Sequence, residues 1–259
     1  MPNTLAIAIL TLNEAQRIER CIDSAKFADQ VLVIDSGSHD GTQAVARSLG
    51  AQVYEYPDWK GFAEQRTRAL SQVSADYVLF LDADEVITPE LQTEIRAAVA
   101  GGRDAVWKVI WNQVAFGRTL DRMAHSGGAK RMFKTSSLLR FEGAVHERAI
   151  TNTELPILTF KARLPHYSRE SVYGSLLKLA QYVQLGAAKR AAQGKRGGIL
   201  HGMISAFSIF FKNYILRRGF MCGAAGFLHC YFLAQECFFR YAALAYDKQD
   251  VDFLSKRSG

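Results

Sequence analysis

The segment YVLFLDADEVITPEL, Tyr77–Leu91, gives the strongest indication of the fold. It opens with a short apolar run that predicts a buried β-strand. Three acidic residues, Asp82, Asp84 and Glu85, follow at once with a single alanine among them. A threonine and a proline then predict the cap and the first position of a helix. A buried strand that ends in acidic residues and leads into a helix is typical of a parallel sheet that binds ligands at the carboxyl ends of its strands.

The same strand–helix unit recurs through the first hundred residues. Apolar runs predict strands at residues 5–10, 31–34, 51–56 and 76–81. Helical spacing predicts helices at residues 13–26, with Asn13 as the N-cap, and at 40–50, 61–73 and 88–100. Residues 104–167 predict an antiparallel extension of the sheet, and the pattern is helical from Ser171 onwards. We therefore expect an α/β fold with a mainly parallel sheet flanked by helices and a helical C-terminal region.

Composition restricts the class of partner. The 259 residues carry a formal net charge of +7, with a pI near 9.3, which favours an anionic partner. A nucleic acid is not expected, because the chain has no helix-turn-helix or RNP-like motif and its strand ends are acidic. The four cysteines lack the spacing of a zinc site, as expected for reduced thiols in a cytoplasmic protein. Neither a basic leader nor an uninterrupted apolar stretch of about 20 residues is present.

Asp82 and Asp84 predict a site for a divalent cation. Two carboxylates held close together repel each other unless one is protonated or a cation lies between them. Mg²⁺ or Mn²⁺ prefers oxygen ligands, and one or two carboxylates with substrate phosphates is its usual arrangement. The alternative is that these acids only cap the following helix, although Thr88 already fills that position. Asp35 ends the second strand, where it either accepts hydrogen bonds from a base or ribose or shapes the loop DSGSHDGT.

Four segments in a fixed order carry a family resemblance: TLNEAQRIERCIDSA (11–25), VLVIDSGSHDGT (31–42), GFAEQRTRAL (61–70) and YVLFLDADE (77–85). They resemble the inverting glycosyltransferases of family 2, which have the Rossmann-like GT-A fold. The resemblance implies that residues 1–170 form a nucleotide-sugar-binding and catalytic domain. It makes Asp82–Ala83–Asp84 a DXD motif, with Asp84 at the metal and Asp82 near the ribose or the metal. The resemblance also implies that a set of polar residues lies beside the donor. These are Thr11, Asn13, Glu14, Asp35, Gln65, Arg66 and Asp82. Many relatives have an asparagine where this chain has Thr67.

An inverting transfer needs a base that takes the proton from the acceptor hydroxyl. The segment FEGAVHERA offers Glu142 and Glu147, and resemblance to the lipopolysaccharide-core branch of the family favours Glu147; the alternative is an Arg–Glu surface pair. In HSGGAKRMFK, Lys130 and Arg131 supply cations for phosphate or an anionic acceptor, or else form a solvated basic loop. His166 either reaches the metal or diphosphate or is structural.

The resemblance implies transfer of a hexose, glucose from UDP-glucose, to a heptose of the lipopolysaccharide inner core. A polyprenyl phosphate acceptor is an alternative, and a metal-dependent nucleotidyltransferase is a second class. Residues 171–259 join bulky aromatics to Lys212, Arg217, Arg218 and Arg240. Such a region either lies on the anionic inner face of the inner membrane, beside a lipid-linked saccharide acceptor, or packs on protein.

Overall fold

The computed structural model describes residues 1–124, 127–143 and 147–247. The chain divides into two compact units. The first consists of Met1–Trp111 and Gly127–His166, and the second of Asn112–Ser126 and Tyr167–Gly259. The predicted boundary between residues 170 and 171 lies close to the last point at which the chain passes from the first unit to the second, between His166 and Tyr167. Residues 112–126 also belong to the second unit. The division of labour between a catalytic domain and a helical region stays a prediction.

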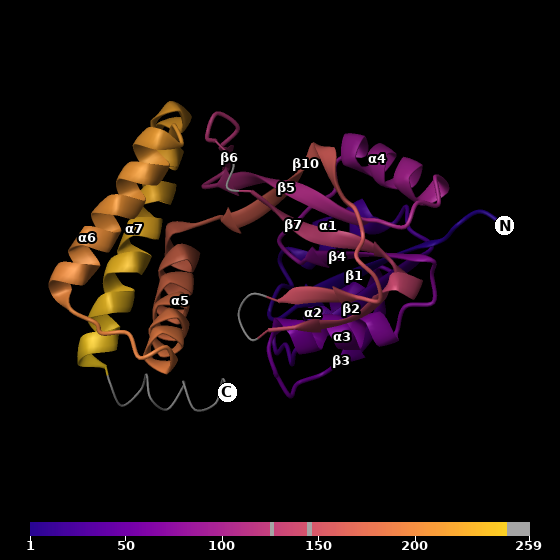
Figure 1. Ribbon diagram of the computed structural model, residues 1–259, viewed down its shortest axis with the longest axis horizontal. Helices are drawn as coiled ribbons and strands as arrows, with labels where there is room; N and C mark the ends of the chain where they lie inside the picture. Colours follow the sequence, from indigo (N-terminus) through magenta and orange to yellow (C-terminus); the bar gives the residue numbers. More distant parts are fainter. Residues whose placement is uncertain (125–126, 144–146, 248–259) are drawn as a thin grey trace. The chain divides into compact units, whose positions relative to one another are not determined.

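The first unit is built on a mixed sheet with the strand order β10-β5-β7-β4-β1-β2-β3 (Figure 1). Its strands are β1 (Leu5–Thr11), β2 (Gln30–Asp35), β3 (Gln52–Glu55), β4 (Tyr77–Asp82), β5 (Val106–Ala115), β7 (Gly128–Lys134) and β10 (Ile157–Arg169). A short strand, β6 (Arg118–Thr119), pairs with β5. A separate two-stranded sheet joins β8 (Leu138–Glu142), which follows a 3₁₀ turn at Thr135–Ser137, to β9 (Arg148–Thr151).

The strand directions place the polar strand ends together. β1 pairs in parallel with β2 and with β4, and β2 with β3, as the alternation of strands and helices predicts. In this register Thr11 is the partner of Asp35, and Leu10 is the partner of Asp82. β7 runs antiparallel to both β4 and β5, which confirms the antiparallel extension. The carboxyl ends of β1, β2 and β4 therefore form one edge, and the acidic motif lies on it.

Helices and a hairpin cover the two faces of this sheet. The helices are α1 (Ile18–Ala25), α2 (Thr42–Ser48), α3 (Phe62–Ser71) and α4 (Pro89–Ala100). One core cluster joins α1, α2 and α4 to the face that carries Ile7, Ile9 and Leu79, and the other joins α3 and β8 to the face that carries Val78 and Phe80. Because residues alternate between faces along a strand, these nearly all-apolar strands are buried on both sides.

The helix starts agree only in part with the sequence analysis. At α4 the Thr88 hydroxyl accepts a hydrogen bond from the Leu91 amide at 3.2 Å, so the predicted cap is confirmed. Asn13 is wrong as the cap of α1, which begins at Ile18 without a side-chain cap. Asn13 has a positive φ of 55°, and its side-chain oxygen accepts from the His39 amide at 2.9 Å. Its side chain therefore joins two loops at the strand edge.

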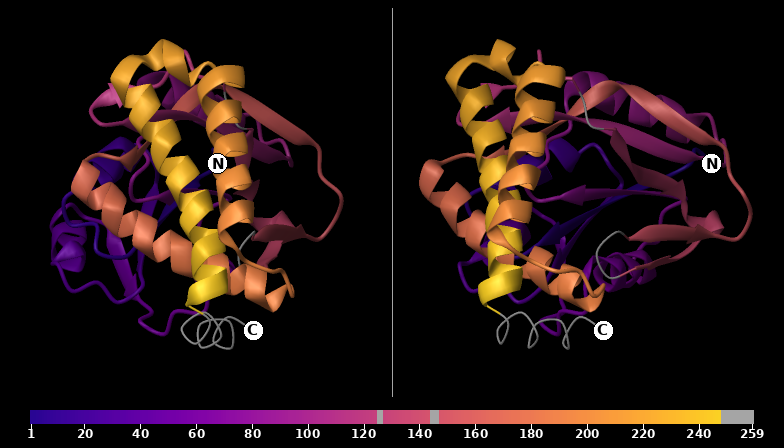
Figure 2. Two further views of the ribbon diagram at one scale, coloured as in Figure 1. Left: turned by 90° about the vertical axis from the view of Figure 1, so that its left-hand side faces the viewer. Right: turned by 60° about the vertical axis from the view of Figure 1, so that its left-hand side comes forward.

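The second unit is helical beyond β10. It contains α5 (Val172–Ala192), α6 (Ile199–Phe211), a π-helical turn (Lys212–Leu216), a 3₁₀ turn (Gly219–Cys222) and α7 (Gly223–Tyr246). α6 and α7 pack side by side as an antiparallel hairpin, and α5 packs on α7 (Figure 2). Within the described part of the chain, one helical segment, Ile199–Leu216, is long and apolar enough to cross a membrane by those two criteria alone.

Candidate functional site

A cluster of arginines and acids lies at the carboxyl end of β4. The Asp82 carboxylate is held by Arg66 of α3, at 3.1 Å, and by Arg131 of β7, at 2.6 Å. Both arginine side chains are almost fully buried. Arg66 also lies 3.3 Å from the Glu147 carboxylate. The sheet order explains the meeting, because β7 lies directly beside β4 and α3 covers one face of the same strands.

Glu85 is the buried partner that completes this cluster. Its carboxylate is fully buried and accepts hydrogen bonds from the Trp111 indole at 2.5 Å, from Arg131 at 3.0 Å and from the Asp82 backbone amide at 2.9 Å. Buried charges persist when they are paired and hydrogen-bonded. Arg131 therefore pairs with two acids at once, and the Trp111 indole of β5 donates a hydrogen bond to the second of them.

The arginines shift the proton affinities of their partners. Burial alone would raise the pKa of Asp82, but the charges of Arg131 and Arg66 hold it well below its usual range. Burial raises the pKa of Glu85; Arg131 opposes this rise and the neighbouring Asp82 charge adds to it. Burial lowers the pKa of Arg131, but Asp82 and Glu85 outweigh it and raise that pKa. The two arginines thus favour the ionised form of Asp82 and act as its counter-ions.

Asp84 pairs with His166, while Asp82 pairs with the two arginines. The Oδ2 atom of Asp84 lies 3.4 Å from Nε2 of His166 on β10. A backbone hydrogen bond from Val86 to Pro165, of 3.1 Å, holds the two segments together. Burial alone would lower the pKa of His166, but the hydrogen bond and the charge of Asp84 raise it. The sequence-distant residue predicted to join the DXD motif thus lies beside its second aspartate.

The donor set can be compared with the predicted cation. Among the described residues, no group of three or more His, Cys, Asp and Glu side chains is placed to hold a metal ion. Asp84 and His166 do form a carboxylate–imidazole pair, and a divalent cation that also binds substrate phosphates needs only one or two protein ligands. These two side chains fit such an ion. Asp82, the other predicted ligand, has both carboxylate oxygens engaged by arginines.

The two candidate bases differ in their surroundings. The Glu147 carboxylate is 26% exposed and contacts Arg66 of the cluster. Glu142 instead pairs with Arg140 on the same strand, at 2.5 Å, and with Arg148, at 3.9 Å. Residues 144–146, which include the histidine of the segment FEGAVHERA, lie outside the described residues. The geometry brings Glu147, and not Glu142, into contact with an arginine that also holds Asp82.

Lys130 and Arg131 lie on a strand, so the alternative of a solvated basic loop is wrong. Both lie on β7, where neighbouring side chains point to opposite faces of the sheet. Arg131 is buried in the cluster, while Lys130 is exposed. Among the described residues, no hydrogen bond or ion pair joins Lys130 to another predicted site residue, so its role at the donor stays a prediction.

A second group of predicted residues lies at the ends of β1 and β2. Asp35 is fully buried and accepts from the amides of Gly37 and Ser38 and from the Ser38 hydroxyl. It therefore shapes the loop, and its contact with a base stays a prediction. Gln65 donates to the Ser36 hydroxyl at 3.2 Å, which connects this loop to α3 and Arg66.

Thr11 and Glu14 complete this group. The Thr11 hydroxyl and the Gln65 side-chain oxygen are buried polar atoms without a hydrogen-bond partner among the described residues. The Glu14 carboxylate pairs with Arg17 at 2.6 Å, and its backbone amide donates to the Thr42 hydroxyl. Orphaned polar atoms next to a loop built from Asp and Ser side chains suit an edge that receives a polar ligand.

Sequence reasoning missed two residues of the cluster. Glu85 was read only as one of three acids, and Trp111 was not singled out. A buried indole needs an acceptor for its N–H group, so the tryptophans of β5 carried a usable signal. That signal could not name Glu85, because the pairing depends on how β5, β7 and β4 are ordered in the sheet.

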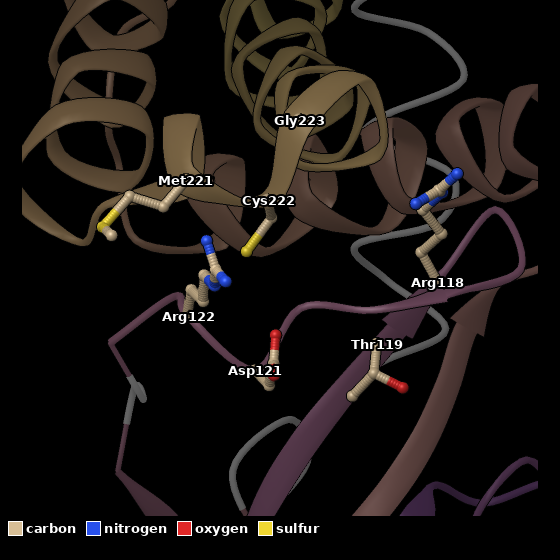
Figure 3. Close-up of a pocket in the computed structure, with 7 residues that line it drawn as sticks. All are labelled: Arg118, Thr119, Asp121, Arg122, Met221, Cys222 and Gly223. Atoms are coloured by element: carbon tan, nitrogen blue, oxygen red, sulfur yellow. The ribbon is translucent and has the colours of Figure 1, made fainter.

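A small cavity in the second unit contains none of the predicted residues. It has a volume of about 450 Å³ and is lined by Arg118, Thr119, Asp121, Arg122, Met221, Cys222 and Gly223 (Figure 3). Arg122 points toward Cys222 in this view. The candidate site is therefore the strand edge of the first unit.

Comparison with known proteins gives one family. The sequence pattern of glycosyl transferase family 2 matches residues 6–148, which include both groups of site residues except His166. An uncharacterized glycosyltransferase of Rickettsia bellii is 32% identical over 248 residues, which cover 91% of this chain and 84% of that protein. The lipopolysaccharide core biosynthesis glycosyltransferase LpsC of Rhizobium meliloti is 26% identical over 232 residues, covering 86% and 85% of the two chains.

Solved structures show more limited likeness. Glucosyl-3-phosphoglycerate synthase from Mycobacterium tuberculosis, crystallised with Mn²⁺, UDP-glucose and phosphoglyceric acid, matches with 28% identity and a TM-score of 0.37 over 42% of this chain and 44% of that one. Mannosyl-3-phosphoglycerate synthase from Rubrobacter xylanophilus matches with 24% identity and a TM-score of 0.41, covering 51% and 54%. The chain thus spans about half the length of these two structures.

Proposed function

Since the chain belongs to glycosyl transferase family 2 and has the expected GT-A fold, we propose that it is a metal-dependent, inverting hexosyltransferase. Family membership removes the nucleotidyltransferase alternative. The observation that carries the proposal is the meeting, at one strand edge, of the DXD aspartates with Arg66, Glu147 and His166. These residues come from five separate elements or loops, and their meeting is what a nucleotide-sugar site requires.

The donor lies along the carboxyl edge of β1, β2 and β4. Thr11, Asn13, Glu14 and Asp35 surround the nucleotide, and Gln65, Arg66, Asp82, Lys130 and Arg131 lie toward the ribose and diphosphate. This assignment rests on the family resemblance. Its support is positional: Arg66 and Arg131 lie together at the end of β4, where both guanidiniums pair with the Asp82 carboxylate.

The reaction needs a base opposite the leaving group. The Glu147 carboxylate accepts the proton of the acceptor hydroxyl as that oxygen bonds to the anomeric carbon. The bond from this carbon to the diphosphate oxygen breaks, and its electron pair leaves with the nucleoside diphosphate. Arg66 holds Glu147 on one side and Asp82 on the other, which orients the carboxylate. Attack from the face opposite the diphosphate inverts the anomeric configuration.

Asp84 and His166 are the side chains that hold Mg²⁺ or Mn²⁺, and Asp82 lies at the ribose side. When bound, the cation stabilises the negative charge that develops on the leaving diphosphate. The support is the approach of Asp84 to His166 within 3.4 Å. These two side chains would supply one oxygen and one nitrogen ligand, which suits a divalent cation that also binds substrate phosphates.

The donor sugar is glucose from UDP-glucose, and the acceptor is a heptose of the lipopolysaccharide inner core. Both assignments rest on resemblance, and LpsC supports the acceptor class at 26% identity over most of its length. A polyprenyl phosphate is the alternative acceptor. In either case the acceptor is lipid-linked, so the enzyme works as a peripheral protein on the cytoplasmic face of the inner membrane.

A donor screen tests the proposal directly. The purified protein is incubated with Mn²⁺ and a panel of UDP-, GDP- and dTDP-sugars, and release of the nucleoside diphosphate is measured. We expect hydrolysis or transfer with UDP-glucose above all. Release from none of the donors, with the protein folded and an acceptor extract supplied, contradicts the proposed activity.

Asp84→Ala tests the metal assignment by a binding measurement. Without its carboxylate the site loses an oxygen ligand, so Mn²⁺-dependent binding of UDP should fall by at least about tenfold. Binding of UDP is measured by calorimetry with Mn²⁺ and with EDTA. Glu90→Ala, on the exposed first turn of α4, is the control and should bind as the parent does. Unchanged Mn²⁺-dependent affinity in Asp84→Ala removes Asp84 from the metal site.

A further inference from the structure

Helix α6 and the π-helical turn after it expose an almost wholly apolar face. Only 11% of Ile199–Leu216 is buried. The most exposed side chains are those of Phe207, at 71%, and Leu200, at 68%. The exposed apolar side chains of this segment are Ile199, Leu200, Met203, Ile204, Phe207, Phe211, Ile215 and Leu216. We call these residues the α6 face. A helix on the surface of a soluble domain normally places polar residues there.

The α6 face is not the face that holds the helix in the fold. A Cβ added to Gly202 would lie 2.9 Å from the Phe238 carbonyl oxygen, so this side of α6 packs closely on α7. Asn213 is buried on the same segment and donates to the Ile209 carbonyl at 2.8 Å. The packing of α6 thus uses Gly202 and Asn213, together with the half-buried rings of Phe210 and Tyr214, which pack around Ala225 and Cys230. The side chains of the α6 face are exposed instead.

The stretch of sequence that contains the α6 face carries charge of a single sign. From Ser171 to Gln235 the chain has eight lysines and arginines and no aspartate or glutamate. The rest of the chain carries 24 basic and 25 acidic residues, so this segment accounts for the whole positive excess. Lys195 and Arg196 precede α6, and Lys212, Arg217 and Arg218 end it. A surface flanked by cations at both ends is complementary to anionic headgroups.

We propose that the α6 face docks on an anionic lipid bilayer, with the helix lying in the plane of the interface. Its apolar side chains enter the acyl boundary, and the cations at both ends lie at the level of the lipid phosphates. A spanning helix would separate these cations across the bilayer. It would also draw in α7, which carries the ion pair of Glu236 and Arg240. The in-plane arrangement keeps all of these charges in or near water.

This inference deepens the lipid-linked acceptor of the proposed function but does not depend on sugar transfer. Vesicle binding is measured without donor or metal. A chain that binds vesicles and releases no nucleoside diphosphate would contradict the proposed function and leave the docking surface in place. A chain that releases nucleoside diphosphate but does not bind vesicles would contradict the docking surface and leave the proposed function in place.

Co-sedimentation with vesicles tests the surface. The full chain is mixed with vesicles of phosphatidylcholine alone and of phosphatidylcholine with phosphatidylglycerol. We expect binding to the anionic vesicles and weaker binding at high salt. The double variant Leu200→Gln/Phe207→Gln should bind at least about tenfold more weakly, because two apolar anchors are lost. The matched control is Leu139→Gln/Ile157→Gln, at positions of the first unit that are 52% and 53% exposed.

Four outcomes overturn the proposal. They are no binding by the parent, equal binding by the α6 variant, equal loss in the control, and retention of the bound protein after washing with alkaline carbonate, which indicates a spanning helix. Sedimentation equilibrium without lipid tests whether a second copy of the chain occupies the α6 face instead of a bilayer. A dimer that the α6 variant dissociates, with no vesicle binding by the parent, assigns the face to a second copy of the chain. Circular dichroism confirms that each variant is folded.

Discussion

At the scale of single residues, Glu147 gives the sharpest test of mechanism. Glu147→Gln preserves the size of the side chain and removes its ability to take a proton, so transfer should fall by about 10²–10⁴-fold while donor binding is kept. The rate of transfer and the affinity for UDP-glucose are measured separately. Glu142→Gln, on a carboxylate that pairs with Arg140 instead, should transfer at the parent rate. If the two variants behave in the opposite way, the base is Glu142.

Asp82 predicts a dependence of stability on pH. Its pKa in the folded state is lowered by Arg131 and Arg66 against the effect of burial, so its ionised form stabilises the fold above the ordinary carboxyl pKa. This contribution is complete at neutral pH and is lost as the pH falls below about 4. Asp82→Asn should therefore unfold more easily at pH 7, by about 1–3 kcal/mol, and the difference should shrink toward pH 3. Urea unfolding across this range measures it, and a difference that stays constant contradicts the ion-pair argument.

At the scale of elements, β7 offers neighbouring residues with opposite environments. Arg131→Met leaves the carboxylates of Asp82 and Glu85 without their shared cation, and the free energy of unfolding should fall by about 3–5 kcal/mol. Lys130→Met, on the exposed side of the same strand, should change it by less than about 0.5 kcal/mol. Thermal or urea unfolding compares the two. Equal effects would mean that the strand, and not the buried charge cluster, responds to substitution.

The hairpin of α6 and α7 depends on a glycine contact. A Cβ on Gly226 would lie 2.2 Å from the Gly219 carbonyl oxygen, so Gly226→Ala forces the 3₁₀ turn away from α7. We expect a loss of about 1–3 kcal/mol. Ala224→Ser, at an exposed position of the same helix, is the control. Urea unfolding followed by far-ultraviolet circular dichroism measures both variants, and an unchanged midpoint for Gly226→Ala contradicts the close contact.

The elements that sequence predicts well are those with local signals. Apolar runs located β1, β2 and β4, and the threonine–proline pair located the start of α4 within the chain. The part of the site at the ends of the parallel strands was predictable, because the carboxyl ends of such strands meet at one edge of the sheet. The pairing of Glu85 with Trp111 was not, because it needs β7 inserted antiparallel beside β4. The Thr67 hydroxyl accepts a hydrogen bond from the Phe141 amide at 3.0 Å and so fixes β8 on α3, a contact between residues 74 positions apart.

At the scale of the whole molecule, each unit has its own core. The clusters of the first unit lie on the two faces of its sheet, and those of the second lie between α5 and α7 and around Leu120, Met123 and Cys230. Sequence could not say which apolar residues of the second unit are buried, because nearly every face of residues 199–246 is apolar and no period stands out. In the structure α6 buries Gly202 and exposes large side chains such as Leu200 and Phe207.

The two units lead to a prediction about how the acceptor is presented. If the first unit holds the donor and the α6 face holds the membrane, the Leu200→Gln/Phe207→Gln variant keeps its donor chemistry and loses access to a lipid-embedded acceptor. Release of UDP from UDP-glucose without acceptor should match the parent. Transfer to acceptor in anionic vesicles should fall by at least about tenfold, while transfer to the same acceptor freed of its acyl chains should not. A variant that loses transfer to both acceptors equally would show that the α6 face acts on the donor site itself.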